Sequence, residues 1–107
     1  MLEKFWKDEC LKIFSKRVLA LKELFDYLPE FSLKIRFMKT RWGVCNRSNN
    51  TITLNSELLK KEITLLDYVI VHEMCHFKHH NHSKDFWNEV SKYYPYYKLA
   101  RKKLKEV

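Results

Sequence analysis

The chain has 107 residues, a formal net charge of +8 at pH 7, and 46% hydrophobic side chains. This apolar content is enough for one core and too high for a disordered tail, so we expect a single domain over residues 1–107. The longest apolar runs, such as residues 68–71, fall far short of the ~20 residues that a membrane span requires. The three cysteines lack C-x-x-C spacing and no apolar signal peptide opens the chain, so we expect a cytoplasmic protein without a membrane partner.

The first predicted element is a long helix. Apolar residues recur at helical spacing over residues 2–28, and Pro29 ends the pattern. Three short strands are predicted next, at residues 32–37, 40–45 and 51–54, because polar and apolar residues alternate there between turn-forming segments. A short helix follows the third strand.

An apolar helix is predicted from Thr64 to about residues 79–81, where Asn81 tolerates the conformation that ends a helix. Ser83 can cap a further helix, and a last one covers residues 96–105. Helices and strands together predict an α+β fold with a small three-stranded sheet, either antiparallel or mixed.

The apolar helix contains the H-E-x-x-H pattern at residues 72–76. Four residues advance a helix by about 6 Å and slightly more than one turn, so His72 and His76 emerge on one face. That spacing lets two ring nitrogens reach one Zn²⁺ at about 2.0–2.1 Å. Glu73 follows the first histidine, so its carboxylate projects beside the metal and can engage a metal-bound water. We therefore predict a catalytic zinc site with Glu73 as general base.

A catalytic zinc needs a third protein ligand, which must come from beyond a chain reversal. His72, His76 and His80 in a row would span about 12 Å along a helix, too far for one tetrahedral centre. His82 is the first candidate, because it lies between the end of this helix and the start of the next. Glu89 is the alternative ligand, and it becomes an outer partner of the site if His82 binds the metal.

Several segments together resemble the YgjP-like metallopeptidases. In chain order they are residues 38–45 (MKTRWGVC), 52–55 (ITLN), 71–76 (VHEMCH), His79 and 81–87 (NHSKDFW). YgjP-like proteins usually carry an additional N-terminal β-rich region, which this chain lacks. In that reduced form the chain looks like the minigluzincins, stand-alone zincins that are similar to the catalytic domains of membrane-embedded CAAX-protease and HtpX peptidases.

The resemblance implies a zincin-like metallopeptidase fold, a Zn²⁺ cofactor, and metal binding at the positions of His72, His76 and His82. Val44 stands where the family often has Ser, so any hydrogen bond from that hydroxyl is absent. The site itself predicts a zinc-dependent endopeptidase that hydrolyses protein or peptide substrates with Glu73 as the base.

We expect the substrate to lie extended along the third predicted strand, taken as an edge strand. It would pair with the backbone of Thr51, Ile52, Thr53 and Leu54. The residue that stabilises the oxyanion is not evident from the sequence, although four tyrosines are possible donors. They are Tyr93, Tyr94, Tyr96 and Tyr97.

Residues 96–107 form a basic amphipathic segment with three possible roles. It could complete the core, cover the zinc cleft as the latency segment of a zymogen, or exchange with a second chain in a homodimer. Deleting it distinguishes a latency segment, whose loss raises activity, from a core helix, whose loss unfolds the domain.

Two other functions remain open at this point. The positive charge and a similarity to SprT-like proteases favour a DNA-associated protease or a nucleic-acid-binding zinc module, but the basic residues are spread along the chain and mixed with acids. A metal-stabilised structural protein is the second alternative. A purely structural site, however, has no use for a carboxylate beside its first ligand.

Overall fold

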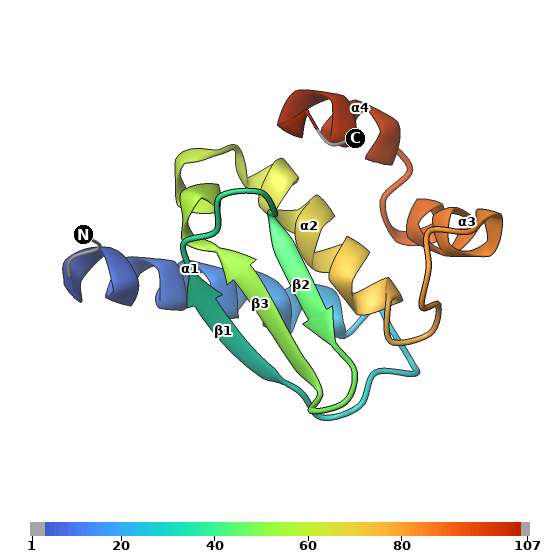
Figure 1. The fold of residues 1–107 in the computed structure, drawn as a ribbon, viewed down its shortest axis with the longest axis horizontal. Helices are drawn as coiled ribbons and strands as arrows, with labels where there is room; N and C mark the ends of the chain where they lie inside the picture. Colours follow the sequence, from blue (N-terminus) through green and yellow to red (C-terminus); the bar gives the residue numbers. More distant parts are fainter. Residues whose placement is uncertain (1–3, 106–107) are drawn as a thin grey trace.

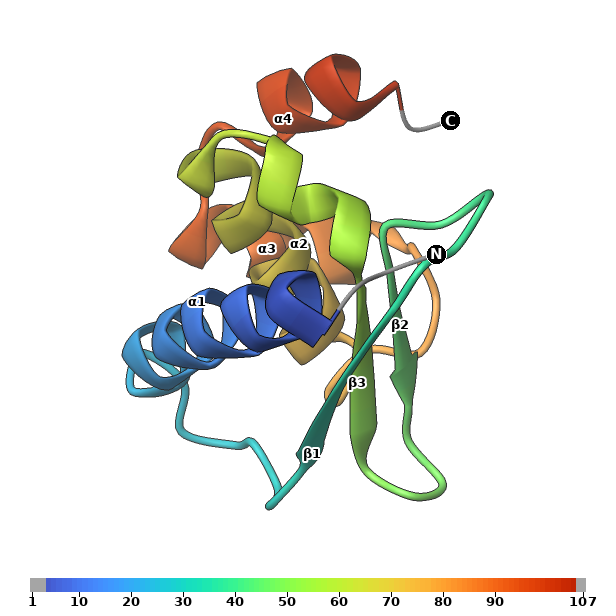
Figure 2. The ribbon, with the colours of Figure 1, turned by 90° about the vertical axis from the view of Figure 1, so that its left-hand side faces the viewer.

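Helices cover one face of a three-stranded sheet (Figures 1 and 2). The structure is a computed structural model and describes residues 4–105. Its elements are α1 (Lys4–Lys22), β1 (Ser32–Arg36), β2 (Gly43–Asn46), β3 (Thr51–Asn55), the 3-10 helix η1 (Ser56–Lys60), α2 (Ile63–Cys75), α3 (Lys84–Tyr93) and α4 (Tyr97–Leu104). Within the described range, no helix has the length and apolar character that a membrane crossing needs.

The sheet is mixed, which is one of the two arrangements that the sequence predicted. Its strand order is β1-β3-β2, with β1 parallel and β2 antiparallel to β3. The expectation that residues 51–54 form an edge strand is therefore wrong. The backbone of β3 pairs with a strand on each side, so it has no free edge for a substrate, and Ile52 and Leu54 are fully buried.

Helix α2 is the centre of the core. It contacts α1, β2, β3, α3 and α4, and its residues from Tyr68 to Cys75 are all buried. The helix ends at Cys75, several residues before the predicted end at 79–81. The backbone N–H groups of His76, Phe77 and Lys78 each bond to the carbonyl three residues earlier, so the last turn tightens. This early end leaves room for the chain reversal that leads to α3.

Helix α1 is unbroken but shorter than the predicted 2–28, because it ends at Lys22 in a turn that buries Phe25. Residues 2 and 3 of that prediction lie outside the described residues. Arg17 clamps α1 to α2: its Nε and Nη2 donate to the two carboxylate oxygens of Asp67 at 2.8 Å each. This bidentate pair fixes the axial position of α2, and hence of the histidines near its end.

Candidate metal centre

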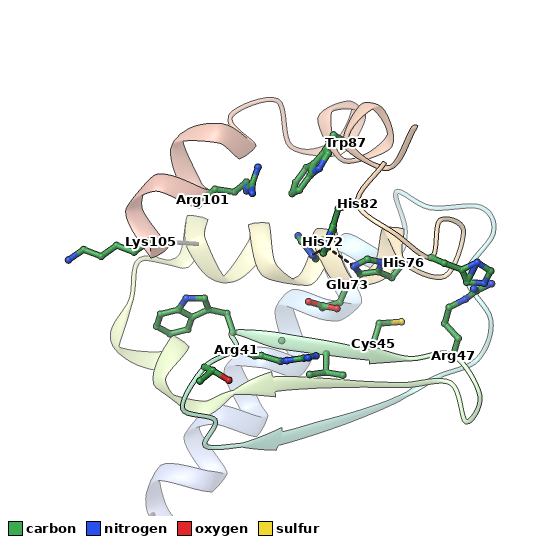
Figure 3. A pocket seen from close by; sticks show the side chains of 15 residues that line it. Arg41, Cys45, Arg47, His72, Glu73, His76, His82, Trp87, Arg101 and Lys105 are labelled. Carbon is green, nitrogen blue, oxygen red and sulfur yellow. Dashed lines mark hydrogen bonds between the residues drawn. The ribbon is translucent and has the colours of Figure 1, made fainter. Parts of the chain in front are cut away.

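Three histidine side chains converge where α2 ends (Figure 3). Nε2 of His82 lies 3.1 Å from Nε2 of His72 and 3.2 Å from Nε2 of His76. Two nitrogens on one tetrahedral zinc lie about 3.4 Å apart, because each is about 2.0–2.1 Å from the metal. Within residues 4–105, this is the one cluster of at least three possible metal ligands. The residues present therefore fit a zinc ion.

The chain reversal between α2 and α3 brings the third histidine to the other two. Ser83 caps α3, with its hydroxyl accepting a hydrogen bond from the N–H of Phe86 at 3.4 Å. The cap places the fully buried Phe86 ring against all three imidazoles, with ring centroids 5.0 Å from His72, 4.5 Å from His76 and 5.0 Å from His82. One aromatic residue thus supports the whole cluster.

Two of the histidines have a hydrogen-bond partner on the far side of the ring. Nδ1 of His76 donates to the carbonyl of His79 at 3.0 Å, and Nδ1 of His72 lies 3.1 Å from the buried Tyr68 hydroxyl. With the ring protons on these Nδ1 atoms, both Nε2 lone pairs face the centre of the cluster, as metal binding requires. Tyr68 lies four residues before His72, so helical spacing could have predicted this contact.

Electrostatics also favour neutral imidazoles. Burial lowers the pKa of His72 to about 3, and positive charge on His76, His82 and Arg101 acts in the same direction. Burial likewise lowers the pKa of His76 below its ordinary value. Neutral rings present lone pairs, and a set of imidazole nitrogens suits Zn²⁺.

The Glu73 carboxylate is buried between the histidines and β2, with only 5% of the residue exposed. Gly43 makes this placement possible: a Cβ there would lie 3.0 Å from Cγ and from Oε2 of Glu73, and 3.0 Å from Cγ1 of Val69. The single glycine therefore marks a close approach of β2 to α2. The close approach holds the Glu73 side chain beside β2 at the edge of the histidine cluster.

A cleft of about 790 Å³ opens over the cluster. Its floor holds the histidines and Glu73, one wall is residues 40–45 with the start of β2, and the other includes Trp87 of α3 and Arg101 of α4 (Figure 3). The edge strand beside the site is therefore β2, since β3 lies in the middle of the sheet. None of the four tyrosines considered as oxyanion donors lines this cleft.

Glu89 does not belong to the cluster of His72, His76 and His82, so the structure does not bear out its prediction as an alternative ligand. Its hydrogen bonds go to residues other than the histidines, which gives no support to its prediction as an outer partner of the site. It is 4% exposed and accepts hydrogen bonds from Nζ of Lys92 and the hydroxyl of Tyr93, both at 3.3 Å. Burial raises the pKa of Glu89, but the Tyr27 hydroxyl and the positive charges of Lys92 and Lys78 lower it by more. The pKa of Glu89 therefore lies below its ordinary value. This carboxylate anchors α3 instead.

Comparison with known proteins gives a family and a fold. The family model described as the YgjP-like metallopeptidase domain matches residues 1–107. The crystal structure of the metallopeptidase zymogen abylysin from Pyrococcus abyssi is 26% identical, with a TM-score of 0.77 over 85% of this chain and 90% of that one. The crystal structure of the metallopeptidase zymogen jannalysin from Methanocaldococcus jannaschii is 24% identical, with a TM-score of 0.74 over 88% of this chain and 90% of that one. No curated protein matches the chain. These findings confirm the predicted α+β metallopeptidase fold.

Proposed function

The chain belongs to the YgjP-like metallopeptidase family, and from that premise we propose that it is an endopeptidase in which Glu73 is the general base. Its family and its three-histidine cluster make it a zinc peptidase. One observation supports the finer proposal: the buried Glu73 carboxylate lies on the floor of the cleft beside three converging imidazole nitrogens. A purely structural zinc site would not need such a group.

His72, His76 and His82 would hold the metal, which when bound supplies a Lewis acid that polarises the scissile carbonyl and acidifies the attacking water. Glu73 accepts the proton that this water loses and then delivers it to the leaving amine nitrogen. Because Gly43 has no side chain, the Glu73 carboxylate can stay between β2 and the histidines during both proton transfers. The free edge of β2 offers backbone groups to an extended substrate, in place of residues 51–54.

Zinc removal tests the activity. The zinc-loaded protein is expected to cut casein or an unstructured peptide library, to stop when a chelator removes the metal, and to recover when zinc is added back. Mass spectrometry of the fragments identifies the cleaved bonds. Internal cuts are expected from a cleft open along the edge of β2. Release of terminal residues alone would contradict an endopeptidase.

We also propose that α4 restricts access to the cleft. Arg101 of α4 lies over the Trp87 ring, with its Cζ 4.4 Å from the ring centroid, and Trp42 Nε1 donates to the Leu104 carbonyl at 3.2 Å. These contacts join α4 to both walls of the cleft. The two matched structures are of zymogens, which fits a latent form of this chain.

Deletion of residues 96–107 is expected to raise the hydrolysis rate per folded molecule, measured by peptide cleavage alongside circular dichroism and size-exclusion chromatography. Because Ala100 and Leu104 are buried, deletion also removes core contacts. A second variant, Lys102→Pro, disrupts the helix while keeping those side chains. If neither variant gains activity, α4 is an ordinary core helix. A dimer that becomes monomeric on deletion would indicate helix exchange.

A further inference from the structure

We infer, on the basis of the proposed peptidase function, that the cleft selects acidic polypeptide segments through a basic groove. The groove runs from the zinc site past Trp42 into a second cavity of about 480 Å³. The two cavities share Thr40, Arg41, Trp42 and Lys105, so they form one continuous surface. The cationic side chains that define the basic groove are Lys39, Arg41, Lys61, Arg101 and Lys105.

Both walls of the groove contribute positive charge. Arg101 extends from α4 and Lys105 caps the end of that helix, whereas Arg41 comes from the segment before β2 on the opposite wall (Figure 3). A peptide lying along the edge of β2 would pass between them. Its carboxylate side chains would meet guanidinium and ammonium groups from two sides, beyond the position of the scissile bond.

Four of the five cations of the groove, all except Arg101, carry positive charge that no ion pair among the described residues balances. Elsewhere, cations such as Arg17, Lys92 and Lys103 are paired with carboxylates. In the part of the chain that the structure describes, no ion pair joins Lys39, Arg41, Lys61 or Lys105 to a carboxylate. The carboxylates that line the two cavities are Glu73, the proposed base, and Glu57, which pairs with Lys60 at 3.2 Å. The groove therefore attracts anionic ligands.

Two features favour an acidic peptide over a nucleic acid. Bases bind single-strand grooves by stacking on open aromatic faces, but Lys61 lies over Trp42, and both Tyr97 and Arg101 stack on Trp87. The free backbone edge of β2 suits an extended peptide. Charge and backbone hydrogen bonding thus act together on a peptide substrate.

A binding experiment with a matched pair of peptides tests the inference. One labelled peptide carries a run of glutamates on one side of an apolar centre, and its counterpart carries glutamines at the same positions. Binding is measured by fluorescence anisotropy on the zinc-loaded Glu73→Gln variant, so that hydrolysis does not interfere. The acidic peptide is expected to bind about tenfold more tightly at low salt, because several exposed ion pairs add up. The difference should shrink as salt increases.

Arg41→Gln and Lys61→Gln, each made in that background, should reduce the preference for the acidic peptide several-fold. Both side chains are exposed, so folding should be unaffected. Arg36→Gln is the matched control, because this exposed arginine ends β1, lines neither cavity and changes the net charge equally. An equal loss in the control would indicate a general charge effect and overturn the inference. Equal binding of the two peptides would also overturn it.

Competition and cleavage separate the remaining outcomes. If oligothymidylate of similar charge binds more tightly than the acidic peptide, the groove is a nucleic-acid site and the inference is wrong. If the wild-type protein cleaves both peptides equally fast, acid selection fails while the peptidase function stands. If the Glu73→Gln variant binds the acidic peptide through Arg41 but neither the wild type nor the variant lacking residues 96–107 cleaves any peptide, the proposed function fails and the basic groove stands.

Discussion

Replacing Glu73 by Gln is expected to lower the rate of peptide hydrolysis by about 10²- to 10⁴-fold, because an amide cannot accept the proton of the attacking water. Gln has nearly the same shape as Glu, which matters because this side chain lies close to β2. A Cβ added at Gly43 would lie 3.0 Å from Cγ and from Oε2 of Glu73. Zinc content should remain near one atom per chain, because the three converging nitrogens belong to histidines. Peptide kinetics and elemental analysis of the same preparation measure the two effects.

Glu23→Gln is a suitable control for this variant. Glu23 is an exposed carboxylate just after α1 and lines neither cavity, so the same chemical change there should leave both rate and metal content unchanged. Undiminished cleavage by Glu73→Gln would assign proton transfer to another group. Loss of zinc together with activity would instead mean that Glu73 holds the site together.

The features of the site that depend on local geometry could be predicted from the sequence. An i, i+4 pair on a helix places two side chains on one face whatever the rest of the fold does, so His72 and His76 were identified from spacing alone. A lone glycine in a strand marks either a bulge or a close approach of another segment, and at Gly43 the structure shows a close approach of the Glu73 side chain. These inferences needed no knowledge of long-range contacts.

The order of the strands could not be predicted in the same way. Alternation of polar and apolar residues describes one strand, but an edge strand and a central strand can share the same pattern. Residues 51–54 were assigned to an edge, whereas β1 pairs with β3 on the side opposite β2. That parallel pairing joins segments distant in sequence, and no turn motif specifies it. The proposed substrate strand therefore moves to β2.

The third ligand illustrates the same limit. Spacing left His82 and Glu89 open, because the direction of the chain after the reversal at 76–81 is set by tertiary packing. In the structure α3 turns Glu89 toward Lys92 and Tyr93, while His82, just before the cap of α3, reaches the other histidines. Glu89 follows His82 by seven residues, and seven residues along a helix return to nearly the same face. A small change in where α3 begins would therefore change which of the two residues approaches the metal.

Zinc affinity is expected to fall in a graded series across three variants. His82→Ala should weaken binding more than about 100-fold, because it removes one of three converging nitrogens. Tyr68→Phe keeps the buried ring but removes the hydroxyl 3.1 Å from Nδ1 of His72, so a loss of about 10- to 100-fold is expected. Glu89→Gln should leave affinity unchanged, since its hydrogen bonds go to Lys92 and Tyr93.

Competition with a zinc indicator dye measures the affinities, and thermal unfolding of the zinc-free proteins separates metal binding from folding. Glu89→Gln should lower the free energy of unfolding by about 1–3 kcal/mol, because it weakens a buried, charged hydrogen-bond acceptor without touching the histidines. His82→Ala should have the opposite profile, with little effect on the zinc-free protein, because this histidine is exposed. If Glu89→Gln weakened zinc binding more than His82→Ala, the third ligand would be the carboxylate, and α3 would have to rotate on metal binding to bring it to His72 and His76.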